Sequence, residues 1–102
     1  MIVTTDPVAG GTVRIRVSGE IDMATADDVQ RAVRQALDTP GVTEIAVDLA
    51  GVTFCDSSGI AVLDEGFGVA AQHGIRFRAV DPQPVVRRVL EIVGMLDILA
   101  QP

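Results

Sequence analysis

The residues of this sequence best suited to chemistry lie together in the run Asp56-Ser57-Ser58-Gly59. The run follows an apolar, strand-like segment and opens a helical one, so Asp56 is placed to accept the first N–H groups of the helix as its cap. Ser57 then takes the first helical position, exposed at the end of the sheet. On spacing alone a plain helix cap explains these residues, because caps of this composition are common.

Most enzyme mechanisms lack their residues in this chain. A serine nucleophile needs a base beside it, but the only histidine, His73, lies at the far end of the same predicted helix, roughly 24 Å from Ser57 at 1.5 Å per residue. The sequence has no P-loop and no Gly-x-Ser-x-Gly elbow. One cysteine and one histidine make no convincing zinc site. We therefore predict no catalytic residue, no metal and no cofactor.

Composition narrows the class of protein further. The 102 residues predict a single domain, 1–102, and 48% of them are hydrophobic, which is enough for a core. A net charge of −6 argues against holding nucleic-acid phosphates by charge, and three Phe without Trp or Tyr make no base-stacking platform. No apolar run approaches the ~20 residues of a membrane span. Without a signal-peptide pattern, and with Cys55 as its single cysteine, the chain is expected to be cytoplasmic.

Strand and helix patterns alternate along the chain. Strands are predicted at 2–5, 12–17, 44–49 and 75–79, and helices at 25–37, 57–73 and from 81–84 to 93. The first two strands predict an antiparallel hairpin, and the two strand–helix–strand units that follow predict parallel strands with right-handed crossovers. Each strand has one apolar and one polar face. The predicted fold class is therefore α/β, a small mixed sheet with helices mainly on one face and the other face wet.

Local patterns give three further predictions. Thr25 and Asp28 resemble a capping box at the start of the first helix. Gly66 and Gly68 each cost roughly 1 kcal/mol relative to Ala in a helix interior, and we expect them to allow close packing on the sheet. Cys55, at a strand end, is expected to be a buried small hydrophobe rather than an oxidant sensor.

Three separated parts of the sequence resemble the STAS domain, as found in bacterial anti-sigma factor antagonists. They are residues 48–63, which contain the Asp-Ser-Ser-Gly run, the element Gly19-Glu20-Ile21-Asp22, and residues 80–90. Together they cover nearly the whole chain in the order of the family. The resemblance implies a STAS-like domain that regulates transcription indirectly by binding a protein, and not an enzyme.

The resemblance also implies a mechanism of partner switching. The unphosphorylated antagonist binds an anti-sigma factor that is itself a serine kinase, which frees the sigma factor. The kinase then phosphorylates the first serine after the aspartate, binding is lost, and a PP2C-type phosphatase restores it. Carried over, the phosphorylated residue is Ser57, in a partner-binding surface with Asp22, Asp56, Ser58 and Gly59. A phosphate adds about −1.5 to −2 charges beside Asp56, so like charges would repel at the docking surface.

Two alternatives stay open at this point. The first is a STAS domain with another task, either a scaffold of a stressosome or a subunit of a lipid or anion transport assembly. The second, from a different class, is a small nucleotide-binding protein or hydrolase. Incubation with ATP and GTP, followed for binding and turnover, separates that second class from the binding modules.

Overall fold

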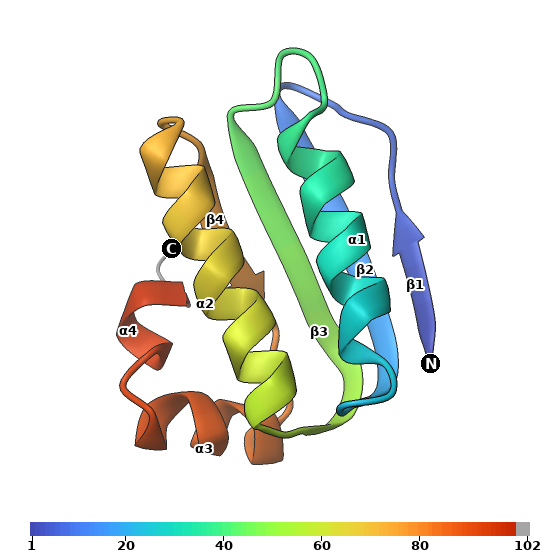
Figure 1. Cartoon of the computed structure of the whole chain (residues 1–102), viewed down its shortest axis with the longest axis vertical. Coiled ribbons are helices and arrows are strands. Elements are labelled where there is room, and N and C mark those ends of the chain that lie inside the picture. The colour runs from blue at the N-terminus through green and yellow to red at the C-terminus, as the bar shows by residue number, and fades with distance from the viewer. Residues whose placement is uncertain (100–102) are drawn as a thin grey trace.

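Residues 1–99 are described by the computed structural model, and they form an alternating set of strands and helices (Figure 1). The strands are β1 (Ile2–Thr5), β2 (Thr12–Ile21), β3 (Glu44–Cys55) and β4 (Arg76–Val80). The helices are α1 (Ala26–Leu37), α2 (Ser57–Gln72), α3 (Pro84–Ile92) and α4 (Leu96–Leu99). The predicted α/β class is confirmed.

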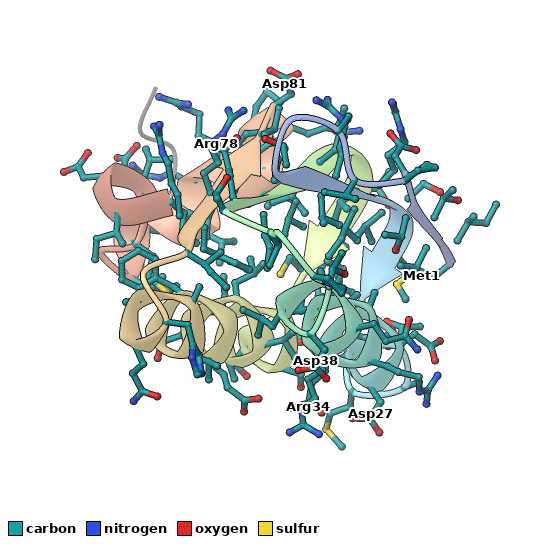
Figure 2. The ribbon with its side chains drawn as sticks, turned by 90° about the horizontal axis from the view of Figure 1, so that it is seen from above. Met1, Asp27, Arg34, Asp38, Arg78 and Asp81 are labelled. Atoms are coloured by element: carbon teal, nitrogen blue, oxygen red, sulfur yellow. The ribbon has the colours of Figure 1, made fainter. Side chains whose placement is uncertain are left out.

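The strands form one mixed sheet in the order β1-β2-β3-β4. β1 is antiparallel to β2, while β2, β3 and β4 run parallel, as the sequence predicts. α1 and α2 both lie on the same face of the sheet, and the chain moves across it in one direction, from β2 to β3 to β4 (Figure 1). With this direction both crossovers are right-handed. Figure 2 shows this arrangement along the strands, with Arg34 on the outer side of the helices and Arg78 on the opposite face of the sheet.

The core lies between the sheet and the apolar stripes of α1 and α2. Its fully buried side chains include Ile15, Ile45, Leu49, Leu63 and Leu90. Gly66 lets α2 lie close to the sheet, because a Cβ added at this position would lie 2.9 Å from Cζ of Phe77. The predicted packing role is therefore confirmed for Gly66, but it is wrong for Gly68, which is exposed and has open space around it.

Two strands run further than their alternation predicts. β2 continues to Ile21 and β3 to Cys55, beyond the predicted ends at residues 17 and 49. The pairing between them shifts twice, after Arg16 and after Gly19, and each time β3 contributes one more residue than β2. Such bulges break the two-residue period on which strand prediction depends. Because of these extensions, β2 and β3 both end beside the start of α2.

The face of the sheet opposite α1 and α2 is less wet than predicted. Ala46 and Asp48 of β3 are buried, although their alternation assigns them to a polar face. Arginine side chains from the neighbouring strands cover them, and Arg14 Nη2 lies 2.7 Å from Asp48 Oδ2. Burial alone would raise the pKa of Asp48, but the Ala50 N–H and the Arg14 guanidinium outweigh it and lower that pKa below its usual value.

Candidate functional site

The Asp-Ser-Ser-Gly run lies where β3 passes into α2, and Asp56 caps the helix. Its backbone is extended, and its carboxylate accepts hydrogen bonds from Ser58 N at 2.8 Å and Gly59 N at 3.4 Å. These N–H groups belong to the first turn of a helix and have no partner within it. The cap predicted at Asp56 is thus present, and it fixes the position of the residue that follows.

Ser57 is the first residue of α2 and its side chain is exposed, whereas Ser58 is half-buried. The hydroxyl of Ser57 is therefore the one open to an incoming enzyme. His73 caps the other end of this helix of 16 residues. A Ser57–His73 pair is excluded by that separation, which is about 24 Å at 1.5 Å per residue.

Asp22 lies beside this run because β2 and β3 end together. Ile21 pairs with Cys55 in the sheet, and the N–H of Asp56 donates to the carbonyl of Ile21 at 3.1 Å. Adjacent strands are about 4.8 Å apart, so the residues that follow each pair member, Asp22 and Asp56, are neighbours at one end of the sheet. The carboxylates predicted to flank Ser57 are brought together there.

Asp22 also has a structural role that the sequence did not indicate. Its Oδ1 accepts hydrogen bonds from Ala24 N at 2.9 Å and Thr25 N at 3.1 Å, which forms the turn before α1. Thr25 donates its hydroxyl to the carbonyl of Glu20 at 2.8 Å and makes no side-chain cap, so the predicted capping box with Asp28 is not formed. Asp22 therefore stabilises the turn before α1, and its place in a partner-binding surface stays a prediction.

Gly59 is buried, which does not fit its predicted place on a partner-binding surface. A Cβ at this position would lie 2.5 Å from Cys55 Sγ and 2.8 Å from Ile21 Cγ2. Real Cβ atoms do not approach other atoms so closely. Glycine is thus required for α2 to begin directly against the ends of β2 and β3, and we correct its role to one of packing.

Cys55 is the buried small hydrophobe that its position predicts. Burial, with a smaller contribution from the Asp56 carboxylate, raises the pKa of its thiol to about 11. The thiol therefore stays protonated at neutral pH, and a protonated thiol is a poor nucleophile toward oxidants.

Two exposed apolar side chains lie next to these carboxylates in the chain, and the sequence did not indicate them as site residues. Met23, directly after Asp22, is 83% exposed, and Phe54, two residues before Asp56, is 45% exposed. The exposure of Phe54 could not be predicted by alternation, because the bulges in the pairing of β2 with β3 change which face of the sheet each residue takes. Large apolar side chains beside polar groups are typical anchors of protein interfaces.

The described part of the chain offers little else for ligand chemistry. Among residues 1–99, no three His, Cys, Asp or Glu side chains gather in a group that could hold a metal ion. None of the helices described is long and apolar enough to cross a membrane.

Comparison with known proteins agrees with this architecture. A family model described as the STAS domain matches residues 4–101. The chain belongs to the STAS domain family. An anti-sigma F factor antagonist of Paenibacillus polymyxa is 30% identical over 89 residues, which are 87% of this chain and 76% of that protein. The resemblance drawn from the sequence is confirmed, and this STAS protein stands among the anti-sigma factor antagonists.

Solved structures show the same fold for this STAS domain. An anti-sigma factor antagonist from Mycobacterium paratuberculosis has a TM-score of 0.81 and 28% identity, over 96% of this chain and 83% of that one. The antagonist SpoIIAA in its unphosphorylated form has a TM-score of 0.83 and 24% identity, over 96% of this chain and 85% of that one. SpoIIAA has also been solved in its phosphorylated form, with a TM-score of 0.74.

Proposed function

We propose that this anti-sigma factor antagonist binds an anti-sigma factor serine kinase while Ser57 is unphosphorylated, and that phosphorylation of Ser57 ends the binding. The observation that carries the proposal is the exposed Ser57 hydroxyl at the first position of α2, with Asp22 and Asp56 beside it. Binding would free the sigma factor held by the kinase, so the protein would act on transcription without touching nucleic acid.

The docking surface is formed by residues from two strand ends. Asp22 and Asp56 supply acceptors and negative charge, while Met23 and Phe54 supply apolar area. A complementary partner presents an apolar pocket with basic or N–H groups around it. Such a surface resembles the common interface plan of apolar anchors within a polar rim.

Phosphorylation changes this surface by charge. The kinase transfers the γ-phosphoryl group of ATP to Ser57 Oγ, with loss of the hydroxyl proton and release of ADP. The ester adds about −1.5 to −2 charges. Asp56 already accepts from Ser58 N and Gly59 N, so the helix end has fewer free donors with which to neutralise a phosphate. The added charge therefore stays unneutralised beside the Asp56 carboxylate, and docking would have to remove water from it without a group to pair it, which costs several kcal/mol.

The reverse step needs a second enzyme. A PP2C-type phosphatase would hydrolyse the exposed phosphoserine to serine and inorganic phosphate, which returns the binding form. Both steps use ATP or protein partners of the cytoplasm, where we place the protein. The chain itself supplies the substrate serine and, in this proposal, no catalytic group.

The proposal is tested with the kinase captured from the native cytosol. Ser57→Ala and Ser57→Asp proteins serve as baits, and we expect only Ser57→Ala to retain an anti-sigma factor kinase. That kinase and ATP should then modify wild type and Ser58→Ala, with phosphopeptide mapping placing the group on Ser57. Modification on Ser58, or none on either serine, would contradict the proposal. Incubation of the chain alone with ATP should give no turnover.

A further inference from the structure

Met23 is the most exposed large apolar side chain in the described part of the chain, at 83%. It lies in the turn between β2 and α1, where small polar residues and glycine are more usual because they suit the backbone. Single exposed apolar side chains are common on protein surfaces. The exposure of Met23 therefore gains meaning only from what holds the turn and from what surrounds it.

The turn that carries Met23 is held by hydrogen bonds on both sides of this residue. The Thr25 hydroxyl donates to the carbonyl of Glu20 at 2.8 Å and accepts from the N–H of Asp22 at 2.9 Å. The Asp22 carboxylate in turn accepts from the N–H groups of Ala24 and Thr25. Met23 lies between these bonded residues, so its backbone is ordered before a partner arrives.

The same turn lies beside the phosphorylation site. Ile21 pairs with Cys55 in the sheet. Met23 and Ser57 each follow a member of this pair by two residues. The N–H of Asp56 donates to the carbonyl of Ile21 at 3.1 Å, which holds the two segments together beyond the strands. Figure 1 shows the turn before α1 and the start of α2 at the same end of the sheet. A protein that covers Ser57 from this end therefore also meets Met23.

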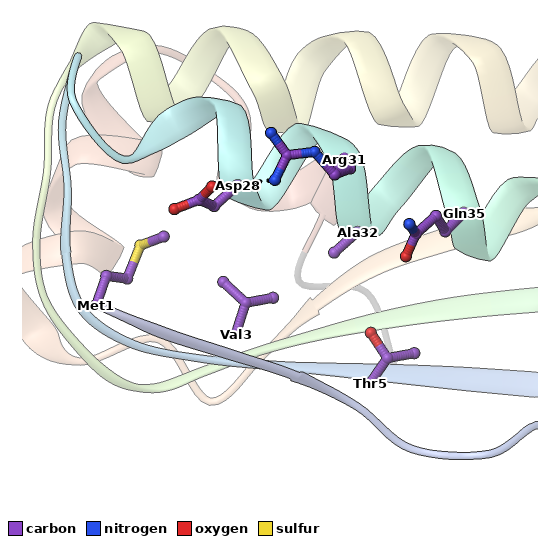
Figure 3. A pocket seen from close by; sticks show the side chains of 7 residues that line it. All are labelled: Met1, Val3, Thr5, Asp28, Arg31, Ala32 and Gln35. Carbon is purple, nitrogen blue, oxygen red and sulfur yellow. Dashed lines mark hydrogen bonds and ion pairs between the residues drawn. The ribbon is translucent and has the colours of Figure 1, made fainter.

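The carboxylates around this turn have no ion-pair partner in the described part of the chain. Glu20, Asp22 and Asp56 form no salt bridge there. The groove between β1 and α1 differs, because its Arg31 lies 3.3 Å from Asp28 and these charges are paired within the chain (Figure 3). An apolar side chain among unpaired negative charges fits an apolar pocket with a basic rim, and it disfavours a second copy of this acidic chain.

We propose that Met23 is the anchor by which the anti-sigma factor kinase recognises this protein, and that Thr25 is the residue that positions it. The inference rests on the function proposed above and deepens it, because it assigns partner recognition to one preformed side chain. The unbranched, polarisable side chain of methionine fills irregular apolar pockets. A turn that is already ordered loses little conformational freedom on docking, so more of the contact appears as affinity.

The anchor serves both binding and phosphorylation. Met23 lies beside Ser57 but takes no part in the transfer of the phosphoryl group, so its contact is the same in the bound substrate and in the transition state. Loss of such a contact raises KM and leaves kcat unchanged. Met23 therefore determines which kinase is bound, and not how fast the group is transferred.

Titration of the kinase captured with Ser57→Ala tests the anchor. Met23→Ala should weaken binding by roughly 10- to 100-fold, and it should raise the KM for phosphorylation of Ser57 with kcat unchanged. Met23→Leu keeps the apolar volume and should bind like wild type. Val8→Ala is the matched control, because Val8 is 44% exposed and precedes β2 at the end opposite Ile21. An effect of Met23→Ala no larger than that of Val8→Ala would overturn the anchor.

A double-mutant cycle tests the positioning role of Thr25. Thr25→Val removes the hydroxyl and should weaken binding by about two- to tenfold, whereas Thr25→Ser keeps it and should bind like wild type. In the Met23→Ala background, Thr25→Val should have little further effect, because it acts through Met23. Thermal melts set a titration temperature at which every variant is folded. Additive effects of the two changes would show that Thr25 does not act through Met23.

The anchor and the switch fail in different ways in these experiments. Absence of binding between wild type and the kinase would contradict the proposed switch and, with it, the anchor. Normal binding that is lost on phosphorylation of Ser57, together with a Met23→Ala protein that binds like wild type, would overturn the anchor alone.

Discussion

Replacement of Ser57 by Asp is the most direct probe of the switch, and its effect on folding can be worked out first. The side chain places one negative charge at the N-terminus of α2, which the helix dipole favours by about 0.3–1 kcal/mol. Repulsion from the Asp56 carboxylate, at ~6 Å in water, costs about 0.7 kcal/mol. The two effects offset, so we expect the free energy of unfolding to change by less than ~0.5 kcal/mol and Tm by less than about 4 °C.

The effect of Ser57→Asp on binding should be much larger. Docking removes water from the surface around Ser57, and a charge left unpaired there costs several kcal/mol. At about 1.4 kcal/mol per tenfold, the affinity for the anti-sigma factor kinase should fall by one or more orders of magnitude. Ser57→Asn is the matched control, because it has the size of Asp without the charge, and it should bind more tightly than Ser57→Asp.

Calorimetric titration of the kinase with each variant, beside thermal melts, measures both quantities. Protein phosphorylated by the kinase is titrated in the same series, since a carboxylate has less charge than a phosphate. Equal affinities of Ser57→Asp and Ser57→Asn would refute the electrostatic reasoning. Tighter binding by Ser57→Asp would instead indicate a partner that recognises phosphoserine.

Three other predictions concern the residues that support the site. Asp22→Ala should lower the free energy of unfolding by about 1–2 kcal/mol through the loss of its turn hydrogen bonds, and it should also weaken kinase binding. Asp22→Asn should keep most of the stability. Thermal melts that show no loss of stability for Asp22→Ala would contradict the capping role. Gly59→Ala should destabilise the folded domain by about 1–3 kcal/mol, because the added Cβ meets Cys55 and Ile21. Gly68→Ala, in open space on the same helix, should stabilise the domain by up to ~1 kcal/mol. If urea unfolding shows changes of the same sign for both variants, the packing argument is wrong. Asp48→Asn should cost about 1 kcal/mol by weakening the ion pair with Arg14. Folding lowers the pKa of Asp48, so this contribution is complete above the unfolded pKa of about 3.9 and is lost as the pH falls below it. The difference in Tm between wild type and Asp48→Asn should therefore disappear in acid, and a constant difference would count against it.

The parts of the fold that follow from local pattern could be predicted from the sequence. The cap at Asp56 and the extent of α2 depend on residues that are neighbours in the chain. The parallel direction of β2, β3 and β4 follows from the helices that connect them. The ends of β2 and β3 could not be predicted, because both extensions pass through bulges whose positions depend on the pairing of two distant segments. The burial of Asp48 likewise depends on arginines contributed by another strand.

The candidate site could likewise be predicted only where it depends on residues that are neighbours in the chain. Ser57 and Asp56 were identified from one contiguous run, and the resemblance to the family added Asp22. The packing role of Gly59 was missed because it depends on how closely α2 approaches Ile21 of β2. The exposure of Met23 and Phe54 was missed for a related reason, since both lie where alternation no longer tells inside from outside.

The position of the switch explains how one phosphate can control binding without refolding the domain. A domain of this size has about 5–15 kcal/mol of stability, and a charge at the exposed start of α2 changes that by a fraction of 1 kcal/mol because dipole and carboxylate offset each other. The same charge at a docking surface has no such offset, since Asp56 already occupies the N–H groups of Ser58 and Gly59. Asp56 therefore has two linked roles: it holds Ser57 in an exposed position, and it leaves the charge added there to act on the partner.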